Sequence, residues 1–306
     1  MPSGRRTFEL VPRRRLTGLP FGDLASRRRG HGSDVIAHRP YEPGDPVGSI
    51  DWFASARLSA TSGMDAFVVR QRAADEAPRV VLVVDRRPSM GLYPEPLPWL
   101  AKPAALAQAI AAITASATAA RADLAALDHA DGEPWWLPPG RRDRAGLIAE
   151  REAGGVPFAA PADSLERAIA FLRRRRSDVP SGSFVFVLSD FIPAPPGELW
   201  QNGIACGWDL VPVVIQDPVW EGSFPEVGGV GVPVADAGGA PVGTTRLSRR
   251  SARARRAEHE RRHAALLAQF AAFGIRPVAI ASSDPDDIDT AFAAWAEERR
   301  RTRWAR

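Results

Sequence analysis

Two runs of consecutive apolar residues stand out in the hydrophobic pattern, and each is followed by an acidic residue. Residues 80–84 read VVLVV and stop at Asp85, while residues 184–188 read FVFVL and stop at Ser189-Asp190. Uninterrupted apolar runs of this length predict strands buried on both faces of a parallel sheet. Open α/β sheets place their ligands at the carboxyl ends of such strands. The pattern therefore predicts a site where Asp85 and Asp190 lie close together.

From residue 79 onward, segments with a strand pattern alternate with segments with a helix pattern. This alternation predicts a doubly wound, mostly parallel α/β sheet. Helices are expected at residues 103–120, 141–152, 163–176, 198–205, 249–273 and 286–300. Further strands are expected at residues 123–127, 134–137, 209–216 and 277–281. Residues 131–133 are expected to form a hairpin turn, and residues 138–140 to end the strand that follows it. Residues 217–247 are expected to form a β-hairpin insertion around a turn at residues 236–239.

The first 75 residues lack this regular alternation. A short helix is expected at residues 54–58 and a strand at residues 65–71. We expect residues 1–75 to form an N-terminal segment packed on a main domain of residues 76–303.

Composition changes this picture little. The 306 residues are 45% hydrophobic and 25% charged, which is ordinary for a globular protein. The net charge is +4, and Lys102 is the only lysine. The arginine runs accompany no nucleic-acid-binding motif, so solvated faces are expected and nucleic-acid binding is the weakest function class. The single cysteine, Cys206, excludes an internal disulfide and a cysteine-cluster metal site.

No signal-peptide pattern is visible at the amino terminus. The most apolar long stretch, residues 103–120, is dominated by Ala, Ser and Thr and is short for a bilayer span. We therefore expect no transmembrane segment and a cytoplasmic location. No dinucleotide or P-loop glycine motif is present, and no G-x-S-x-G elbow, which argues against those phosphate-binding and hydrolase classes.

A dense motif, RPYEPGDPVGSIDWFASAR, occupies residues 39–57 and is followed after about twenty residues by VVLVVDRRPSM. This pair of motifs closely resembles the bacterial domain-of-unknown-function family 58. The family signature reads R-x-Y-x-x-G-D-x-x-x-x-I-D-W-x-x-x-A-R, then a von Willebrand factor A-like strand that ends D-x-S-x-S-M. The matching residues are Arg39, Tyr41, Gly44, Asp45, Ile50, Asp51, Trp52, Ala56 and Arg57, and later Ser189-Asp190.

The residues of the first motif leave two interpretations open. Asp51 and Arg57 either tie down a loop around a packed Trp52 or have a catalytic role, since ion-pair networks mimic active sites.

The resemblance implies a von Willebrand factor A-like fold with a metal-ion-dependent adhesion site. Such a site holds Mg²⁺ through carboxylate and hydroxyl oxygens and leaves one position for a carboxylate of a partner. Carried onto this chain, the ligands are Asp85, Ser89 and Asp190. The middle loop falls at Asp163-Ser164, without the threonine that the family pattern has there.

Arg87 replaces the first serine of that site motif, and Arg86 lies beside it. A guanidinium cannot ligate a cation, and its charge competes with one. Two expectations remain open: a Mg²⁺ site, or a metal-free site in which Arg87 pairs with Asp85 or Asp190.

Two functions follow from the resemblance and the residues. The first is a non-enzymatic adaptor whose strand-end face binds a partner protein, for which the resemblance suggests a MoxR-type AAA+ ATPase in chaperone-like complex maturation. The alternative is a metal-dependent hydrolase in which Asp85, Asp190 and Asp51 hold the metal. The sequence predicts no histidine near the strand ends and no clear nucleophile, which counts against the hydrolase.

Overall fold

The structure of the protein is a computed structural model that describes residues 6–12, 35–41, 50–62, 67–72, 78–92, 100–235 and 241–304. The chain divides into two compact units, one of Met1–Arg14 with Pro78–Arg306 and one of Arg15–Ala77. The expected packing of residues 1–75 on the main domain stays a prediction.

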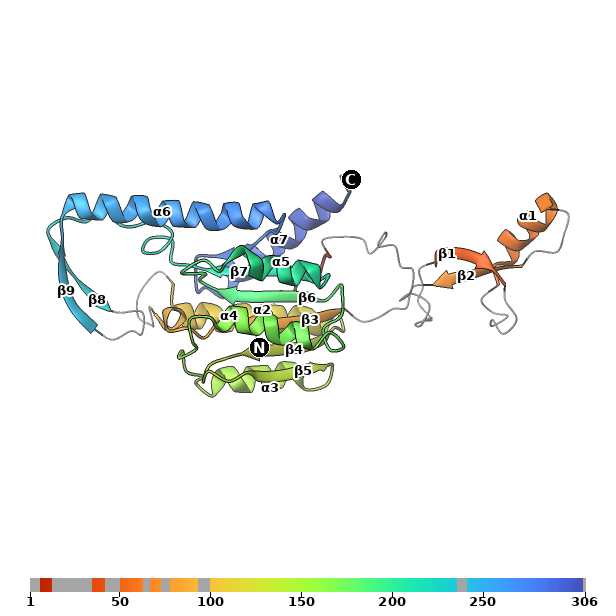
Figure 1. Ribbon diagram of the computed structural model, residues 1–306, viewed down its shortest axis with the longest axis horizontal. Helices are drawn as coiled ribbons and strands as arrows, with labels where there is room; N and C mark the ends of the chain where they lie inside the picture. The colour runs from red at the N-terminus through yellow and green to blue at the C-terminus, as the bar shows by residue number, and fades with distance from the viewer. Residues whose placement is uncertain are drawn as a thin grey trace. The chain divides into compact units, whose positions relative to one another are not determined.

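The larger unit is built on a mostly parallel six-stranded sheet in the order β10-β7-β6-β3-β4-β5 (Figure 1). Every neighbouring pair is parallel except β4 and β5, which are antiparallel. The predicted mixed α/β class is therefore confirmed. The strands are β3 (Arg79–Val84), β4 (Asp123–Asp128), β5 (Trp135–Gly140), β6 (Phe184–Ser189), β7 (Asp209–Ile215) and β10 (Val278–Ile280).

Both faces of the sheet are covered, which explains the uninterrupted apolar runs. Successive side chains of a strand point to opposite faces. Val80, Leu82 and Val84 lie in a core with α2, α3 and α7, while Val81 and Val83 lie in a second core with α4, α5 and α6. The helices are α2 (Lys102–Ala119), α3 (Arg144–Ala153), α4 (Ser164–Arg174), α5 (Gly197–Ala205), α6 (Arg249–Ala272) and α7 (Pro285–Trp304).

Two details differ from the sequence predictions. Strand β5 continues through Pro138-Pro139-Gly140, where a strand end was expected. Proline is tolerated there because β5 lies at the edge of the sheet. Helix α4 covers Ser164–Arg174 and not the predicted residues 163–176, and the Asp163 side chain accepts a hydrogen bond from Arg167 Nε at 2.9 Å.

The hairpin insertion is also present. Strands β8 (Val230–Ala235) and β9 (Pro241–Leu247) pair antiparallel, and the predicted turn at residues 236–239 lies outside the described residues. Ser248 then caps α6 through a reciprocal capping box with Ser251.

The first residues of the chain pack with the sheet unit. The Phe8 ring stacks on the Phe292 ring of α7 with centroids 4.7 Å apart. Arg299 Nη1 donates a hydrogen bond to the Val11 carbonyl oxygen at 3.1 Å. Residues 6–12 therefore extend the core of the larger unit.

The smaller unit contains a two-stranded antiparallel sheet of β1 (Val35–Pro40) and β2 (Val68–Arg72), and the helix α1 (Trp52–Ser62). Strand β1 was not predicted, because its VIAHRP sequence has no alternating pattern and its strand conformation depends on pairing with β2.

Candidate functional site

The carboxyl ends of β3 and β6 lie side by side, because the two strands are parallel neighbours with Val84 opposite Leu188. Asp85 and Ser189 follow directly, and Ser189 Oγ donates a hydrogen bond to Asp85 Oδ2 at 2.6 Å. Asp190 is fully buried beside them. The structure thus places the predicted Asp85 and Asp190 at one edge of the sheet, as the strand pattern indicated.

Arg87 binds between the two aspartates. Its Nε lies 2.9 Å and its Nη2 2.7 Å from Asp85 Oδ2, and the same Nη2 lies 3.6 Å from Asp190 Oδ1. Burial alone would lower the pKa of Arg87, but the hydrogen bond and charge of Asp85, with the charges of Asp190 and Glu166, outweigh burial and raise it. The guanidinium is therefore permanently charged.

Lys102 supplies a second buried cation that sequence reasoning missed. It lies in the first turn of α2 and is fully buried. Its Nζ donates hydrogen bonds to Asp190 Oδ2 at 2.9 Å, to the Ser89 carbonyl oxygen at 3.0 Å, and to the Glu221 carboxylate. The helix dipole disfavours a cation at the amino terminus of a helix. A lone lysine at the start of the predicted helix is therefore a sequence signal that its charge has a specific partner.

Glu221 belongs to the segment that follows β7, and its Oε2 accepts a hydrogen bond from the Asp217 backbone N–H at 2.9 Å. Burial raises the pKa of Glu221, and the neighbouring Lys102 only partly offsets this effect. The residues Asp85, Arg87, Ser189, Asp190, Lys102 and Glu221 are called the strand-end network below.

A second set of buried charges adjoins this network on β4. Asp128, the last residue of β4, accepts two hydrogen bonds from Arg151 of α3, both at 2.7 Å. Arg86 pairs with Glu152 and has its Nε 4.0 Å from Asp128 Oδ2. The predicted neighbour Arg86 is therefore bound toward α3 and not toward Asp85.

Histidines do lie near the strand ends, contrary to the sequence prediction. His129 directly follows β4 and is buried, which lowers its pKa despite the opposing charge of Asp128. His263 Nδ1 lies 2.9 Å from Gln216 Oε1, and Gln216 Nε2 donates to the Asp190 carbonyl oxygen at 2.5 Å. The contacts arise from elements distant in sequence, which is why the local pattern did not reveal them.

The predicted hydroxyl ligands are present without partners. Within the described residues, Ser89 Oγ and Ser164 Oγ are buried and make no hydrogen bond. Asp163 is exposed, and its hydrogen bond with Arg167 lowers its pKa. The strand-end network therefore includes Asp85 and Asp190 but not Asp163.

The family-signature residues lie in the smaller unit. Asp51 Oδ1 accepts a hydrogen bond from the Ala54 backbone N–H at 3.0 Å, and Ser55 Oγ links the Asp51 carbonyl oxygen to the Val68 N–H. This arrangement favours the loop-tying interpretation of Asp51. Trp52 is 59% exposed, and its ring packs edge-on against the Phe67 ring with the centroids 6.0 Å apart.

The rest of the signature is only partly described. Tyr41 N–H donates to the Phe67 carbonyl oxygen at 2.8 Å, and Ile50 forms a β-bridge with Val69. Arg39 contributes to β1 and Arg57 to α1, whereas residues 44 and 45 (Gly44 and Asp45) lie outside the described residues.

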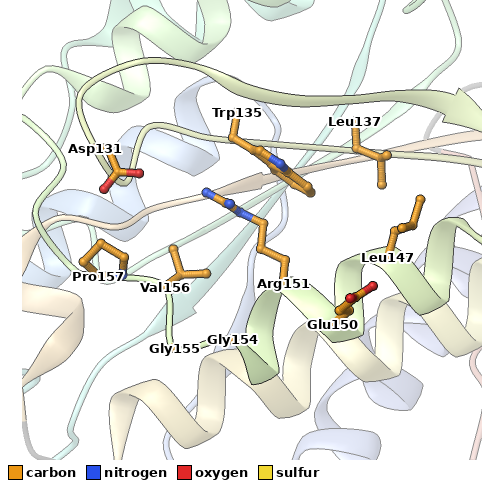
Figure 2. A pocket seen from close by; sticks show the side chains of 10 residues that line it. All are labelled: Asp131, Trp135, Leu137, Leu147, Glu150, Arg151, Gly154, Gly155, Val156 and Pro157. Carbon is orange, nitrogen blue, oxygen red and sulfur yellow. The ribbon is translucent and has the colours of Figure 1, made fainter.

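A cavity of about 530 Å³ opens between β5, α3 and the loop of residues 154–157. The guanidinium of Arg151 lies 4.1 Å from the centre of the Trp135 ring, and Figure 2 shows it reaching across the cavity between Trp135 and Asp131. Leu137 and Leu147 add apolar walls. Because Arg151 also holds Asp128, this cavity adjoins the buried charges at the strand ends.

In the described part of the chain, no group of three or more His, Cys, Asp or Glu side chains is arranged to hold a metal ion. Both carboxylates that the resemblance assigns to Mg²⁺, Asp85 and Asp190, have cationic side chains as partners.

Comparison with known families gives a match that covers most of the chain. Residues 37–266 match the family described as "Protein of unknown function DUF58". The chain belongs to the DUF58 family. The matched range of this DUF58 protein begins in the smaller unit and ends within α6.

Relatives with curated sequences carry no functional description. Uncharacterized proteins of Mycobacterium bovis and Mycobacterium tuberculosis are 36% identical over 85 residues, which is 28% of this chain. The match spans only 25% of the length of each relative.

A solved structure also shows a distant similarity. It is the crystal structure of an aerotolerance-related membrane protein from Bacteroides fragilis with multiple mutations to serines. The TM-score is 0.43 at 13% identity, over 73% of this chain and 99% of the other. In the described part of the present chain, no helix combines the length and apolarity needed to cross a bilayer.

Proposed function

We propose that this DUF58 protein is a non-enzymatic interaction module whose binding face is the carboxyl end of the central sheet. The observation that carries the proposal is the closed strand-end network. Asp85 is held by Arg87, and Asp190 is held by Lys102, so the buried acids are already paired within the chain. A face organised in this way presents a fixed surface to a partner.

The partner proposed is a MoxR-type AAA+ ATPase, in a chaperone-like role in complex maturation. This choice, like the von Willebrand factor A-like character of the fold, is what the resemblance carried by the motifs at residues 39–57 and 80–90 implies. It is supported by family membership across residues 37–266 and by a binding face at strand ends.

The alternative, a metal-dependent hydrolase, has less support. It requires Asp85 and Asp190 to coordinate a metal with an open position for water or substrate. Their hydrogen bonds to Arg87 and Lys102 compete with such coordination. Asp51, the third acid of that proposal, lies in the smaller unit and caps the start of α1.

Exposed side chains around the strand ends are available to contact a partner protein. Asp163 and Arg167 form an exposed ion pair at the start of α4. Arg167 also acts electrostatically on His129 at the end of β4, which locates it near the strand ends. The cavity beside Trp135 and Leu147 offers a recess for an apolar side chain of the partner, and such buried anchors dominate interface energies.

The test is a binding measurement with purified MoxR-type ATPase from the same genome, by biolayer interferometry. Wild type is expected to bind, and Arg167→Glu is expected to bind at least about tenfold more weakly, because rim charges steer association. The matched control is Arg276→Glu. Arg276 is also half exposed and forms an ion pair, with Glu298, but it precedes β10 and so lies at the amino ends of the strands. Absence of binding by wild type, or equal loss in both variants, contradicts the proposal.

A further inference from the structure

We propose that Arg87 and Lys102 permanently take the place of the divalent cation that the family resemblance implies, so that this face is assembled without metal. The residues present do not fit Mg²⁺. The expectation that partner binding needs no metal rests on the proposed function. The claim that the strand ends bind no metal concerns this chain alone and is tested on the isolated protein.

The first support is the set of hydrogen bonds to the Asp85 carboxylate. Oδ1 accepts hydrogen bonds from the Arg87 backbone N–H at 2.9 Å and from Arg87 Nε at 3.1 Å. Oδ2 accepts from Arg87 Nε at 2.9 Å, from Arg87 Nη2 at 2.7 Å and from Ser189 Oγ at 2.6 Å. A carboxylate oxygen offers two lone-pair positions, and these donors, with the single Nε–H shared between both oxygens, compete with a metal for them.

The second support is the position of Lys102 on the other carboxylate. Asp190 Oδ2 accepts from Lys102 Nζ at 2.9 Å, and Oδ1 accepts from the Ile192 backbone N–H at 2.9 Å. Glu221 also contacts Nζ, so three groups including the Ser89 carbonyl oxygen fix the ammonium in place. A divalent ion entering here would have to displace Arg87 and Lys102 from the buried carboxylates that they already bind.

The third support is that hydroxyl groups of the implied donor set are retained. Ser89 Oγ and Ser164 Oγ are buried and make no hydrogen bond within the described residues. Buried hydroxyls without partners are uncommon and call for an explanation. Ser89 and Ser164 are the hydroxyl residues that the resemblance assigns to the donor set, and Arg87→Ser would add a third.

The exchange changes how the face is controlled. A bound metal leaves when its concentration falls or when its ligands are protonated. Arg87 and Lys102 are covalently attached, and both lie at the strand ends in every copy of the folded chain. Partner binding by this DUF58 protein is therefore expected to be insensitive to chelators and to the concentration of free Mg²⁺.

The experiment is thermal unfolding of wild type, Arg87→Ser and Arg87→Lys, each in EDTA and in millimolar Mg²⁺ or Mn²⁺. Wild type and Arg87→Lys are expected to shift by less than about 1 °C, because a metal that does not bind the folded state does not stabilise it. Arg87→Ser removes the guanidinium and supplies the missing hydroxyl, so its midpoint is expected to rise by at least about 3 °C with metal.

Either of two results overturns the proposal: a chelator-reversible rise of at least about 3 °C in wild type, or a folded Arg87→Ser variant that gains no metal response. If Arg87→Ser does not fold, Mn²⁺ is titrated into wild type and Arg87→Lys, and electron paramagnetic resonance measures whether these proteins bind it. Free Mn²⁺ throughout supports the proposal, and stoichiometric bound Mn²⁺ overturns it. Failure of the ATPase to bind leaves all of these readings unaffected.

Discussion

Lys102 is a fully buried cation at the strand ends, and its ammonium donates hydrogen bonds to Asp190 and Glu221. Lys102→Met keeps the side-chain length but leaves both acids without this partner. Removing one member of a buried ion pair costs about 3–5 kcal/mol, and we expect a loss of that order in urea unfolding.

The control for that substitution is Arg167→Met, which breaks an exposed ion pair with Asp163. A loss below about 1 kcal/mol is expected there. Equal losses of unfolding free energy in Lys102→Met and Arg167→Met would show that the buried ion pair stabilises the fold no more than the exposed one.

Glu221 gives the network a pH dependence. Burial raises its pKa above the ordinary value of 4.5, with Asp190 acting in the same direction and Lys102 against it. The folded protein therefore holds this proton to higher pH than the unfolded chain does. The resulting stabilisation is complete below the ordinary value and is lost as the pH rises through the raised folded value.

The free energy of unfolding of wild type and of Glu221→Gln, measured across pH, tests this predicted direction of the change in stability. Glutamine does not titrate, so the stability of wild type relative to the variant is expected to decline as the pH rises above the ordinary pKa of 4.5. A relative stability that is constant or rises over this window would contradict the shift.

Individual site residues were predictable from the sequence only where local pattern placed them. Asp85 and Asp190 each end an apolar run, so a parallel sheet necessarily brings them to one edge. Lys102 reaches Asp190 across 88 residues and Glu221 across 119 residues, and no local pattern encodes such contacts.

Among the elements, the strands of the central sheet were the most predictable, because burial on both faces leaves long apolar runs. Strand β1 was missed, since it has a single partner, β2, and a sequence without alternation. The end of β5 was misplaced because proline interrupts an interior strand but not an edge strand.

Helix α3 and strand β5 together form the cavity beside the strand ends, and Leu147 is its exposed apolar wall. Leu147→Glu is expected to weaken ATPase binding by at least about tenfold, because it places a charge where an apolar anchor would insert. The stability of the variant should change by less than about 0.5 kcal/mol, since the substitution is on the surface.

Leu267→Glu on α6 is the matched control, because Leu267 is 39% exposed and Leu147 is 40% exposed. The control is expected to bind as wild type does in the same titration. Weakened binding by both variants would mean that added charge, and not the cavity, determines the result.

On the scale of the whole molecule, the larger unit is completed by residues from both ends of the chain. Phe8 stacks on Phe292 and packs edge-on against Trp295 and Phe186. Phe8→Ala is expected to destabilise the sheet unit by about 3–5 kcal/mol, because it leaves a cavity among aromatic rings. Phe53→Ala in the smaller unit, at a side chain 75% exposed, is expected to change stability by less than about 0.5 kcal/mol.

Chemical denaturation monitored by tryptophan fluorescence would report both changes. A Phe8→Ala variant with wild-type stability would show that residues 6–12 are not part of the core. The sequence did not predict this packing, because an isolated Phe8 in a charged segment shows no periodic pattern.

The most direct test of the proposed binding face is hydrogen–deuterium exchange of the chain alone and with the proposed partner, a MoxR-type ATPase. If the carboxyl end of the sheet is the binding face, added protection should appear in residues 86–92, 160–167, 190–194 and 216–222. Protection confined to the opposite edge, in residues 121–123, 207–209 and 276–278, would contradict the central claim.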